Sequence, residues 1–255
     1  MGEPEGEAAV LAIRHFTDPG SALAFAAEPR RLTLLWAYGD QLEWELRMAV
    51  RSTERDQRGL DAGRQALWLR RVRRDSGMPI ETRQRRYAAP TVHACRAVVA
   101  VRRRWPRRAD AFLRHLRVLI MGGEMADDSD TFEIAAERAG LPVRELAAYA
   151  GTPEVEAALA EDVRAARGRR CPSLVLAATG AELESEALEA LHRRREPEGV
   201  EDVLAWAPYP LATAEVAAIC ARPVASARED LRRSGARFAP AGGDGYWSRP
   251  SAVMR

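Results

Sequence analysis

A serine near the start of the chain stands where an anion or a sulfur atom could be held. Ser21 follows a turn in which Pro19 and Gly20 set or permit the dihedral angles. The apolar run at residues 10–16 predicts a buried strand, and the pattern at residues 21–38 predicts a helix. Ser21 would therefore cap that helix, where free N–H groups and the helix dipole favour a thiolate or another anion.

A second candidate lies about 150 residues further along. Cys171 precedes Pro172, and the apolar run at residues 174–177 follows. Cis peptide bonds are almost confined to X-Pro sequences, so this dipeptide is a candidate for one. The other cysteines, Cys95 and Cys220, form no pair with redox or metal-ligand spacing, so no metal site is expected. We expect both to be packing residues.

The stretch around Ser21 resembles the DsbA family of thioredoxin-fold proteins. The branch in question carries a motif that reads roughly F-x-D-P-x-C-P-x-C-W-x-x-E-P. The positions that match are Asp18, Pro19, Glu28 and Pro29. The two cysteines of the motif are replaced by Ser21 and Ala24, so the active-site C-x-x-C has become Ser21-Ala22-Leu23-Ala24.

The resemblance implies an α/β fold, a thioredoxin fold with a large all-α insertion. Residues 8–50 and 168–195 would form the thioredoxin-like domain, and residues 60–167 the inserted helical domain. Pro172 would be the family's cis-proline, and Cys171 would lie within a few ångströms of Ser21, next to N–H groups that lower a thiol pKa. The predicted site, made of the former active-site and cis-proline loops, is Asp18, Pro19, Gly20, Ser21, Ala24, Cys171 and Pro172.

The remaining pattern agrees with this division. Alternation over residues 41–50 predicts a second strand, and helical spacing predicts helices near residues 64–78, 90–101, 109–121, 128–139, 143–150 and 153–166. Residues 182–195 are expected to form a closing helix. Residues 200–255 are expected to form a small separate module, with helices at 213–220 and 225–233 and a hairpin around 242–245, similar to a winged helix.

The missing cysteines decide which functions remain open. A hydroxyl cannot exchange with disulfides, so dithiol oxidation or isomerisation by this motif is excluded. The first hypothesis is a protein that has lost redox activity and binds a protein partner or small ligand at the former active site, as adaptors of an adjoining branch do; it requires no cofactor. The alternative is a thiol-cofactor-dependent isomerase or transferase, similar to kappa-class glutathione transferases and hydroxychromene-carboxylate isomerases. Its catalytic residues would be Ser21 and Cys171, with glutathione or mycothiol as cofactor.

Charge suggests a third hypothesis. The net charge is +2, and every basic side chain is an arginine. Nucleic acid could bind the C-terminal module or a basic cluster that consists of Arg102, Arg103, Arg104, Arg107 and Arg108.

The chain has no apolar run of about 18 residues, so no membrane span is expected. Residues 1–7 are acidic, unlike a secretory signal, and the sparse cysteines suit a reducing compartment, so we expect a cytoplasmic protein.

Overall fold

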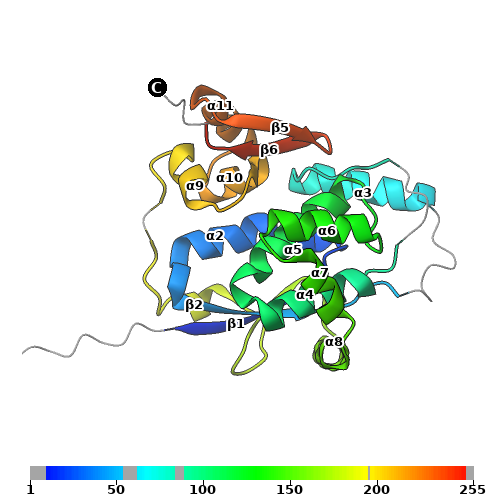
Figure 1. Cartoon of the computed structure of the whole chain (residues 1–255). Coiled ribbons are helices and arrows are strands. Elements are labelled where there is room, and N and C mark those ends of the chain that lie inside the picture. The colour runs from blue at the N-terminus through cyan, green and yellow to red at the C-terminus, as the bar shows by residue number, and fades with distance from the viewer. Residues whose placement is uncertain (1–9, 54–61, 84–88, 195, 251–255) are drawn as a thin grey trace, which may run out of the picture.

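A three-stranded sheet forms the base of the fold. The structure is a computed structural model that describes residues 10–53, 62–83, 89–194 and 196–250. The central strand β1 (Leu11–Thr17) runs parallel to β2 (Leu42–Met48) and antiparallel to β3 (Ser173–Leu176) (Figure 1). Strands β2 and β3, which are far apart in the sequence, therefore both pair with β1, as the resemblance implied.

Two helices, rather than the single predicted one, connect β1 to β2. They are α1 (Ala22–Ala26) and α2 (Glu28–Tyr38), with the break at Ala27. Pro29 lacks an N–H and fits the first turn of a helix, which explains why a new helix starts there. The buried side chains of these helices include Phe25, Leu32 and Trp36, whereas Leu23 is 48% exposed.

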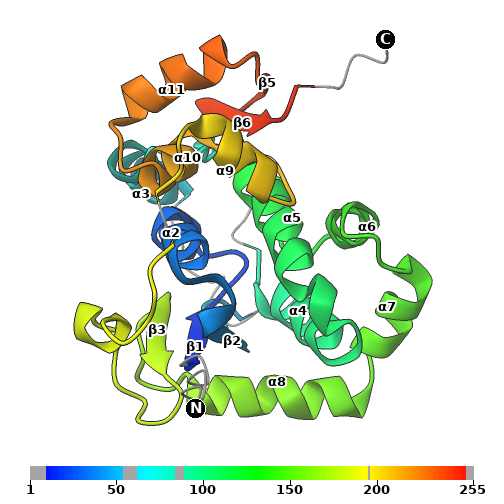
Figure 2. The same ribbon diagram turned by 90° about the vertical axis from the view of Figure 1, so that its left-hand side faces the viewer.

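The inserted helices do not all lie on the same side of the sheet, because α4 (Val92–Arg104) contacts β2, whereas α3 (Ala62–Ser76) lies beside α1 (Figure 2). Side-chain caps begin two of them, from Asp128 and Thr152. The buried faces of α4 and α5 supply much of the largest hydrophobic cluster. The helices are α3 (Ala62–Ser76), α4 (Val92–Arg104), α5 (Ala109–Gly122), α6 (Ser129–Arg138), α7 (Val143–Ala150) and α8 (Pro153–Ala165).

The predicted closing helix at residues 182–195 is wrong. Glu182 forms an isolated antiparallel bridge with Val175, and only the short 3-10 turn η4 (Ser185–Leu188) follows. Leu183 and Leu191 are buried in a cluster with Ile13 of the sheet. Apolar residues in this segment therefore pack on the sheet from irregular backbone, which their spacing alone did not distinguish from a helix.

The C-terminal segment contains the predicted helices and hairpin. Its three-stranded sheet has the order β4-β6-β5. Similarity to a winged helix remains a prediction. The elements are α9 (Val200–Trp206), β4 (Leu211–Ala212), α10 (Thr213–Ile219), α11 (Val224–Arg233), β5 (Arg237–Ala241) and β6 (Asp244–Ser248).

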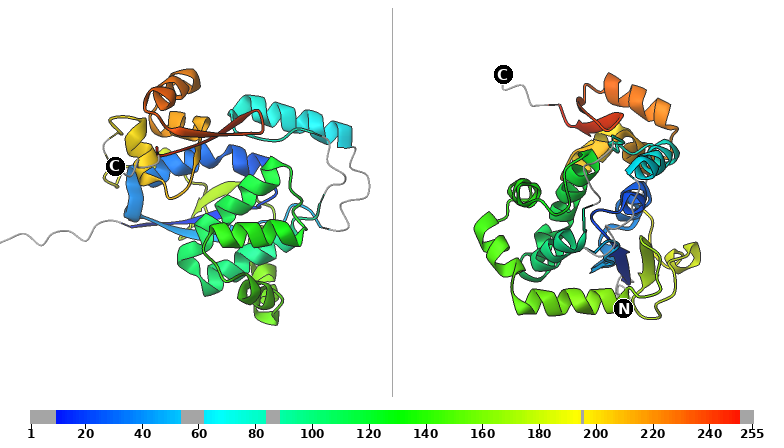
Figure 3. Two further views of the ribbon diagram at one scale, coloured as in Figure 1. Left: turned by 45° about the horizontal axis from the view of Figure 1, so that its top comes forward. Right: turned by 90° about the vertical axis from the view of Figure 1, so that its right-hand side faces the viewer.

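This segment packs directly on the thioredoxin part. Helix α2 lies between the first sheet and the C-terminal elements (Figures 1 and 3). Leu32 and Trp36 of α2 share one hydrophobic cluster with Val216 and Trp247. The hairpin turn at Gly242 approaches the insertion so closely that a Cβ there would lie 2.6 Å from the backbone of Ile80. Among the described residues, no helix is long and apolar enough to cross a membrane.

Candidate functional site

Ser21 caps a helix, as the sequence predicted. Its backbone is extended (φ −81°, ψ 113°), and its Oγ accepts a hydrogen bond from the N–H of Ala24 at 3.2 Å. Its own N–H donates to the carbonyl of Asp18 at 3.1 Å. The cap satisfies one of the free N–H groups at the start of α1, so the hydroxyl already has a structural task.

Asp18 fixes the turn that leads to Ser21. Its buried carboxylate accepts hydrogen bonds from the N–H groups of Gly20 and Arg51, both at 2.7 Å, and from the Thr91 hydroxyl at 2.6 Å. Burial raises the pKa of this carboxyl, against the opposing effect of the three hydrogen bonds. The partners lie in three separate parts of the chain, so Asp18 ties the turn to the end of β2 and the start of α4.

Cys171 and Ser21 meet in space, although 150 positions separate them. The Cys171–Pro172 peptide bond is cis. The Ser21 side chain lies close enough to the Cys171 thiol to influence the pKa of that thiol. The structure therefore brings together the two residues that the sequence marked for chemistry.

The expectation that the pKa of the Cys171 thiol is lowered is wrong, because the pKa is raised. Burial and the negative charge of Asp18 raise its pKa to about 11, although the charge of Arg117 and the hydrogen bond from Ser21 lower it. Helix α1 has only five residues, so its dipole is short. At neutral pH the thiol is consequently protonated, and the thiolate that a nucleophile needs is scarce.

A cavity of about 110 Å³ lies beside Ala24, which occupies the second cysteine position of the motif. The wall includes side chains from β1, α1, α2 and the loop that leads into β3. These residues include His15, Ala24, Glu28, Arg30, Arg31, Pro172, Ser173 and Glu182. Ala24 is 1% exposed and small, so it forms part of the wall of this cavity and supplies no reactive group.

A buried ion network underlies the cavity. The Glu28 carboxylate pairs with Arg31 at 2.9 Å and also with Arg117, which donates in addition to the Thr17 hydroxyl. Burial alone would raise the pKa of Glu28, but the two arginine charges outweigh it and bring the pKa to about 2. The Glu28-Pro29 dipeptide hinted at Glu28, whereas nothing in the sequence marked Arg117.

His15, a residue of β1, lies near this ion network. It is 5% exposed, and its ring meets Trp44 edge to face at 6.2 Å between centroids. Burial lowers its pKa to about 3, and the charges of Arg117 and Arg31 add to the effect. The imidazole is therefore neutral at physiological pH, with one donor and one acceptor nitrogen.

The basic cluster is largely engaged in ion pairs. Arg102 contacts the buried carboxylate of Asp162, with a distance of 2.7 Å, while Arg103 and Arg104 face Glu154 and Glu145. Arg107 and Arg108 are exposed. Helix α11 likewise has its arginines near acids, for example Arg228 with Asp244 at 2.9 Å.

The remaining cysteines are Cys95, which is near enough to Asp18 and Cys171 for their charges to affect it, and Cys220 of the C-terminal segment. Burial raises the pKa of Cys95 well above its usual range and that of Cys220 to about 11. Among the described residues, no group of His, Cys, Asp and Glu side chains could hold a metal ion.

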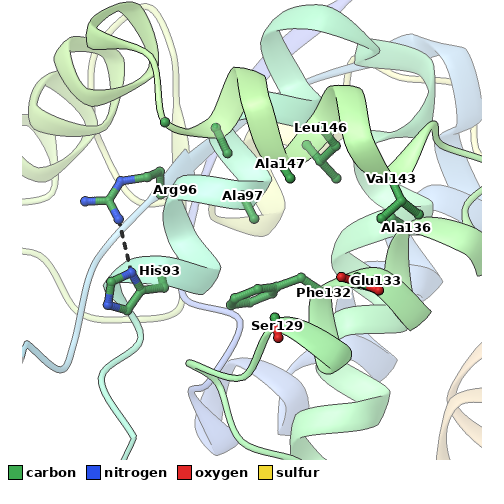
Figure 4. A pocket seen from close by; sticks show the side chains of 12 residues that line it. His93, Arg96, Ala97, Ser129, Phe132, Glu133, Ala136, Val143, Leu146 and Ala147 are labelled. Atoms are coloured by element: carbon green, nitrogen blue, oxygen red, sulfur yellow. Dashed lines mark hydrogen bonds between the residues drawn. The ribbon is translucent and has the colours of Figure 1, made fainter.

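A second cavity, of about 260 Å³, lies within the helical insertion between α4, α6 and α7 (Figure 4). Its walls are mainly apolar, with Phe132 and Leu146 among them, and a hydrogen bond of 3.1 Å joins Arg96 to His93 at one end. The sequence did not point to this place, and no residue of the predicted site lies there.

Comparison with known proteins supports the fold. No protein-family description matches the sequence, and no curated protein is similar to it in sequence. Among solved structures, a provisionally assigned protein disulfide isomerase from Nitrosomonas europaea is 16% identical, with a TM-score of 0.58 over 88% of this chain and 97% of that chain. The cytosolic disulfide reductase DsbM from Pseudomonas aeruginosa, solved with GSH, is 19% identical, with a TM-score of 0.55 over 71% of this chain and 93% of that chain. These likenesses show that the chain has the thioredoxin fold, with helical insertion, of DsbA-like proteins.

Proposed function

We propose that this chain is a redox-silent protein on a DsbA-like scaffold, which binds a peptide segment of a partner, or a small ligand, at the former active site. One observation carries the proposal. The helix start at Ser21 and the cis Cys171–Pro172 bond keep their places, while a hydroxyl and a methyl group occupy the two thiol positions. The chain therefore has a cavity at this place, but it does not have the pair of cysteines that disulfide exchange requires.

The rim of the site suits binding more than chemistry. Leu23, two residues after Ser21, presents 48% of its surface to solvent. Leu23 precedes the cavity-lining Ala24 in the sequence, and an exposed leucine offers an apolar contact for a partner. The Cys171 thiol has a raised pKa and is a poor nucleophile at neutral pH.

The thiol-cofactor alternative has one observation in its favour. The Ser21 side chain is close enough to the sulfur of Cys171 to oppose the rise in the pKa of that thiol, so it can serve a sulfur ligand at this place. Glutathione or mycothiol would then bind with its sulfur near Ser21. A thermal-shift titration separates the hypotheses, because a ligand at 100 times its Kd adds roughly 2.7 kcal/mol of stability. A saturable shift with either thiol supports the enzyme, and none up to millimolar concentration removes it.

Nucleic-acid binding is the weaker alternative. Most arginines of the basic cluster and of α11 face carboxylates, which lowers their availability to phosphates. Retention on heparin or duplex DNA that falls steeply with salt would support it nevertheless.

The binding proposal is tested with a random-peptide phage library. Peptides enriched on the wild type should lose at least tenfold in affinity for Leu23→Glu, since a charge at the rim opposes apolar contact. Ile134→Glu is the matched control, because Ile134 is an exposed apolar residue of α6 (37%). Peptides whose affinity is unchanged by Leu23→Glu, or an absence of enriched peptides, would contradict the peptide form of the proposal.

A further inference from the structure

We propose that the outer face of α3 binds an acidic segment of a partner protein. This α3 surface consists of Leu67, Trp68, Arg70, Arg71 and Arg74, all of which are exposed. The inference goes beyond the proposed function, because the described wall of the cavity beside Ala24 contains no residue of α3.

Helix α3 attaches to the rest of the protein through one stripe of apolar side chains. Leu69 and Val72 are 5% and 6% exposed, and they share a hydrophobic cluster with Phe25 of α1. Residues three or four apart lie on the same face of a helix. The members of the α3 surface have this spacing too, so they form a second stripe, which faces solvent at the outer edge of the molecule (Figure 1).

Two large apolar side chains are exposed next to each other on this surface. Leu67 is 64% exposed and Trp68 is 41% exposed. Among the described residues, no other two exposed large apolar side chains are adjacent in the sequence. Single exposed apolar residues are common on proteins, but tryptophan is enriched among the residues that contribute most to binding at interfaces. Burial of this pair against a partner would therefore stabilise a complex.

The charge of α3 indicates the chemistry of the partner. The helix contains five arginines and one acidic residue, Asp75. Asp75 pairs with Arg74 at 2.9 Å, and both side chains are largely exposed. Arg70 and Arg71 form no ion pair with a described carboxylate, unlike most arginines of the basic cluster. The α3 surface therefore has positive charge available to the carboxylates of a partner.

A protein fits this combination better than nucleic acid or a membrane does. Nucleic acid offers phosphates to arginine and base faces to tryptophan, but little apolar contact to a leucine. A helix that lies on a membrane places its main apolar face in the lipid, whereas that face of α3 is buried in the protein. A segment with Asp or Glu beside Leu or Phe matches both the arginines and the apolar pair.

The test uses the full chain and a pool of short fluorescent peptides whose positions are randomised among Asp, Glu, Leu and Phe. One matched pool replaces Asp and Glu by Asn and Gln, and another replaces Leu and Phe by Ser. In fluorescence anisotropy titrations the acidic apolar pool should bind saturably, and each matched pool should bind at least tenfold more weakly. Equal binding of all three pools, or no saturable binding of the first, overturns the inference.

Variants of the α3 surface locate the binding. Arg70→Glu/Arg71→Glu should weaken binding of the acidic apolar pool at least tenfold, and Trp68→Ser at least fivefold. Because these three side chains are exposed, the variants should keep the melting temperature of the wild type.

Two control variants match these changes elsewhere on the surface. Arg107→Glu/Arg108→Glu makes the same change of charge at two adjacent exposed arginines, and Val163→Ser removes a side chain of α8 that is 41% exposed. Both should bind the acidic apolar pool like the wild type. Weakening by Arg107→Glu/Arg108→Glu as large as that at α3 would mean that net charge alone attracts the peptides, and it would overturn the inference.

One further variant separates this inference from the proposed function. Leu23→Ser should leave binding of the acidic apolar pool unchanged. Pool binding that needs Leu23 and not the α3 surface would leave the proposed function standing and overturn the inference. Pool binding that needs Trp68, while no phage-selected peptide depends on Leu23, supports the inference and contradicts the peptide form of the proposed function.

The other partner classes are outcomes of the same comparison. The probes are a fluorescent single-stranded oligonucleotide and vesicles of phosphatidylcholine and phosphatidylserine. Binding of either probe that Arg70→Glu/Arg71→Glu abolishes, without binding of the acidic apolar pool, overturns the inference in favour of that partner.

Discussion

Two buried arginines lie one helical turn apart on α5 and serve different parts of the molecule. Arg114 pairs with Glu215 of the C-terminal segment, where one of the contacts is 2.7 Å, and donates to the carbonyl of Pro210 at 3.1 Å. Arg117 pairs with Glu28 and Thr17 beneath the candidate site. Both side chains are about 1% exposed.

The difference lies in what surrounds each charge. The ring centroids of Phe25, Tyr209 and Tyr246 lie within 6 Å of the Arg114 guanidinium carbon, so aromatic rings surround this charge. Arg117 instead acts on His15, Glu28 and Cys171 and shifts the pKa of each. Arg114 therefore holds the C-terminal segment in place, and Arg117 sets the electrostatics of the site.

The largest expected effect is on stability. Removal of one partner from a buried ion pair costs about 3–5 kcal/mol, because the other charge is left uncompensated. Arg114→Met and Arg117→Met should each lower the free energy of unfolding by this amount in urea titrations. Arg103→Met is the control, since its pair with Glu154 is exposed and should cost at most about 1 kcal/mol. Losses below 1 kcal/mol at both buried sites would contradict the account.

The next effect is the pH dependence of stability. The pKa of His15 falls from 6.5 to about 3 on folding, so its contribution is present above pH 6.5 and lost as pH falls toward 3. The Glu28 contribution is present above pH 4.5 and lost toward pH 2. Between pH 6.5 and 4.5 His15 should therefore cost about 2–3 kcal/mol, and His15→Gln should remove that share of the slope. His115, whose pKa burial lowers to about 4, contributes a separate share that this variant should leave in place.

His15 also distinguishes the two arginines. Because the charge of Arg117 lowers its pKa, Arg117→Met should raise the His15 pKa measured by NMR, while Arg114→Met should leave it unchanged. Equal shifts in both variants would mean that α5 does not separate the two regions electrostatically.

A third prediction concerns the reactivity of Cys171. A pKa of about 11, against an ordinary 9.0, makes the thiolate about 100-fold scarcer at neutral pH. Iodoacetamide should alkylate it about that much more slowly in native protein than in urea, as followed by peptide mass spectrometry. Arg117→Met should slow the native reaction further. Reaction at the unfolded rate would contradict the assigned environment.

The smallest effect is that of the cap. Ser21→Ala removes the acceptor for the Ala24 N–H and should cost about 1 kcal/mol. Asp128→Ala, which removes the side-chain cap of α6, should cost a similar amount and serves as the comparison. A loss beyond 3 kcal/mol at Ser21 alone would indicate a larger role than capping.

Much of the fold could be predicted from the sequence, because local signals were strong. Alternation identified β2, and spacing with capping residues identified the helices from α3 to α8. Prediction failed where tertiary packing decided the outcome, as in residues 182–195, where a helix was expected and irregular backbone packs on the sheet.

The site could be predicted only in part. Local motifs and the family likeness marked Ser21, Cys171 and Pro172, which the structure brings together. The pKa of Cys171 and the role of Arg117 depend on burial and on contacts across about 100 positions, which one sequence does not record.

The claim that an inherited sulfur-handling site has lost only its thiols is tested most directly by restoring them. The measurement is the rate of insulin reduction, with dithiothreitol as the source of electrons, by the double variant Ser21→Cys/Ala24→Cys beside the wild type. The account predicts no acceleration by the wild type and clear catalysis by the double variant, whose thiols would lie at the start of α1 next to Pro172. Catalysis by the wild type, or a folded double variant that forms the disulfide but does not accelerate the reaction, would contradict it.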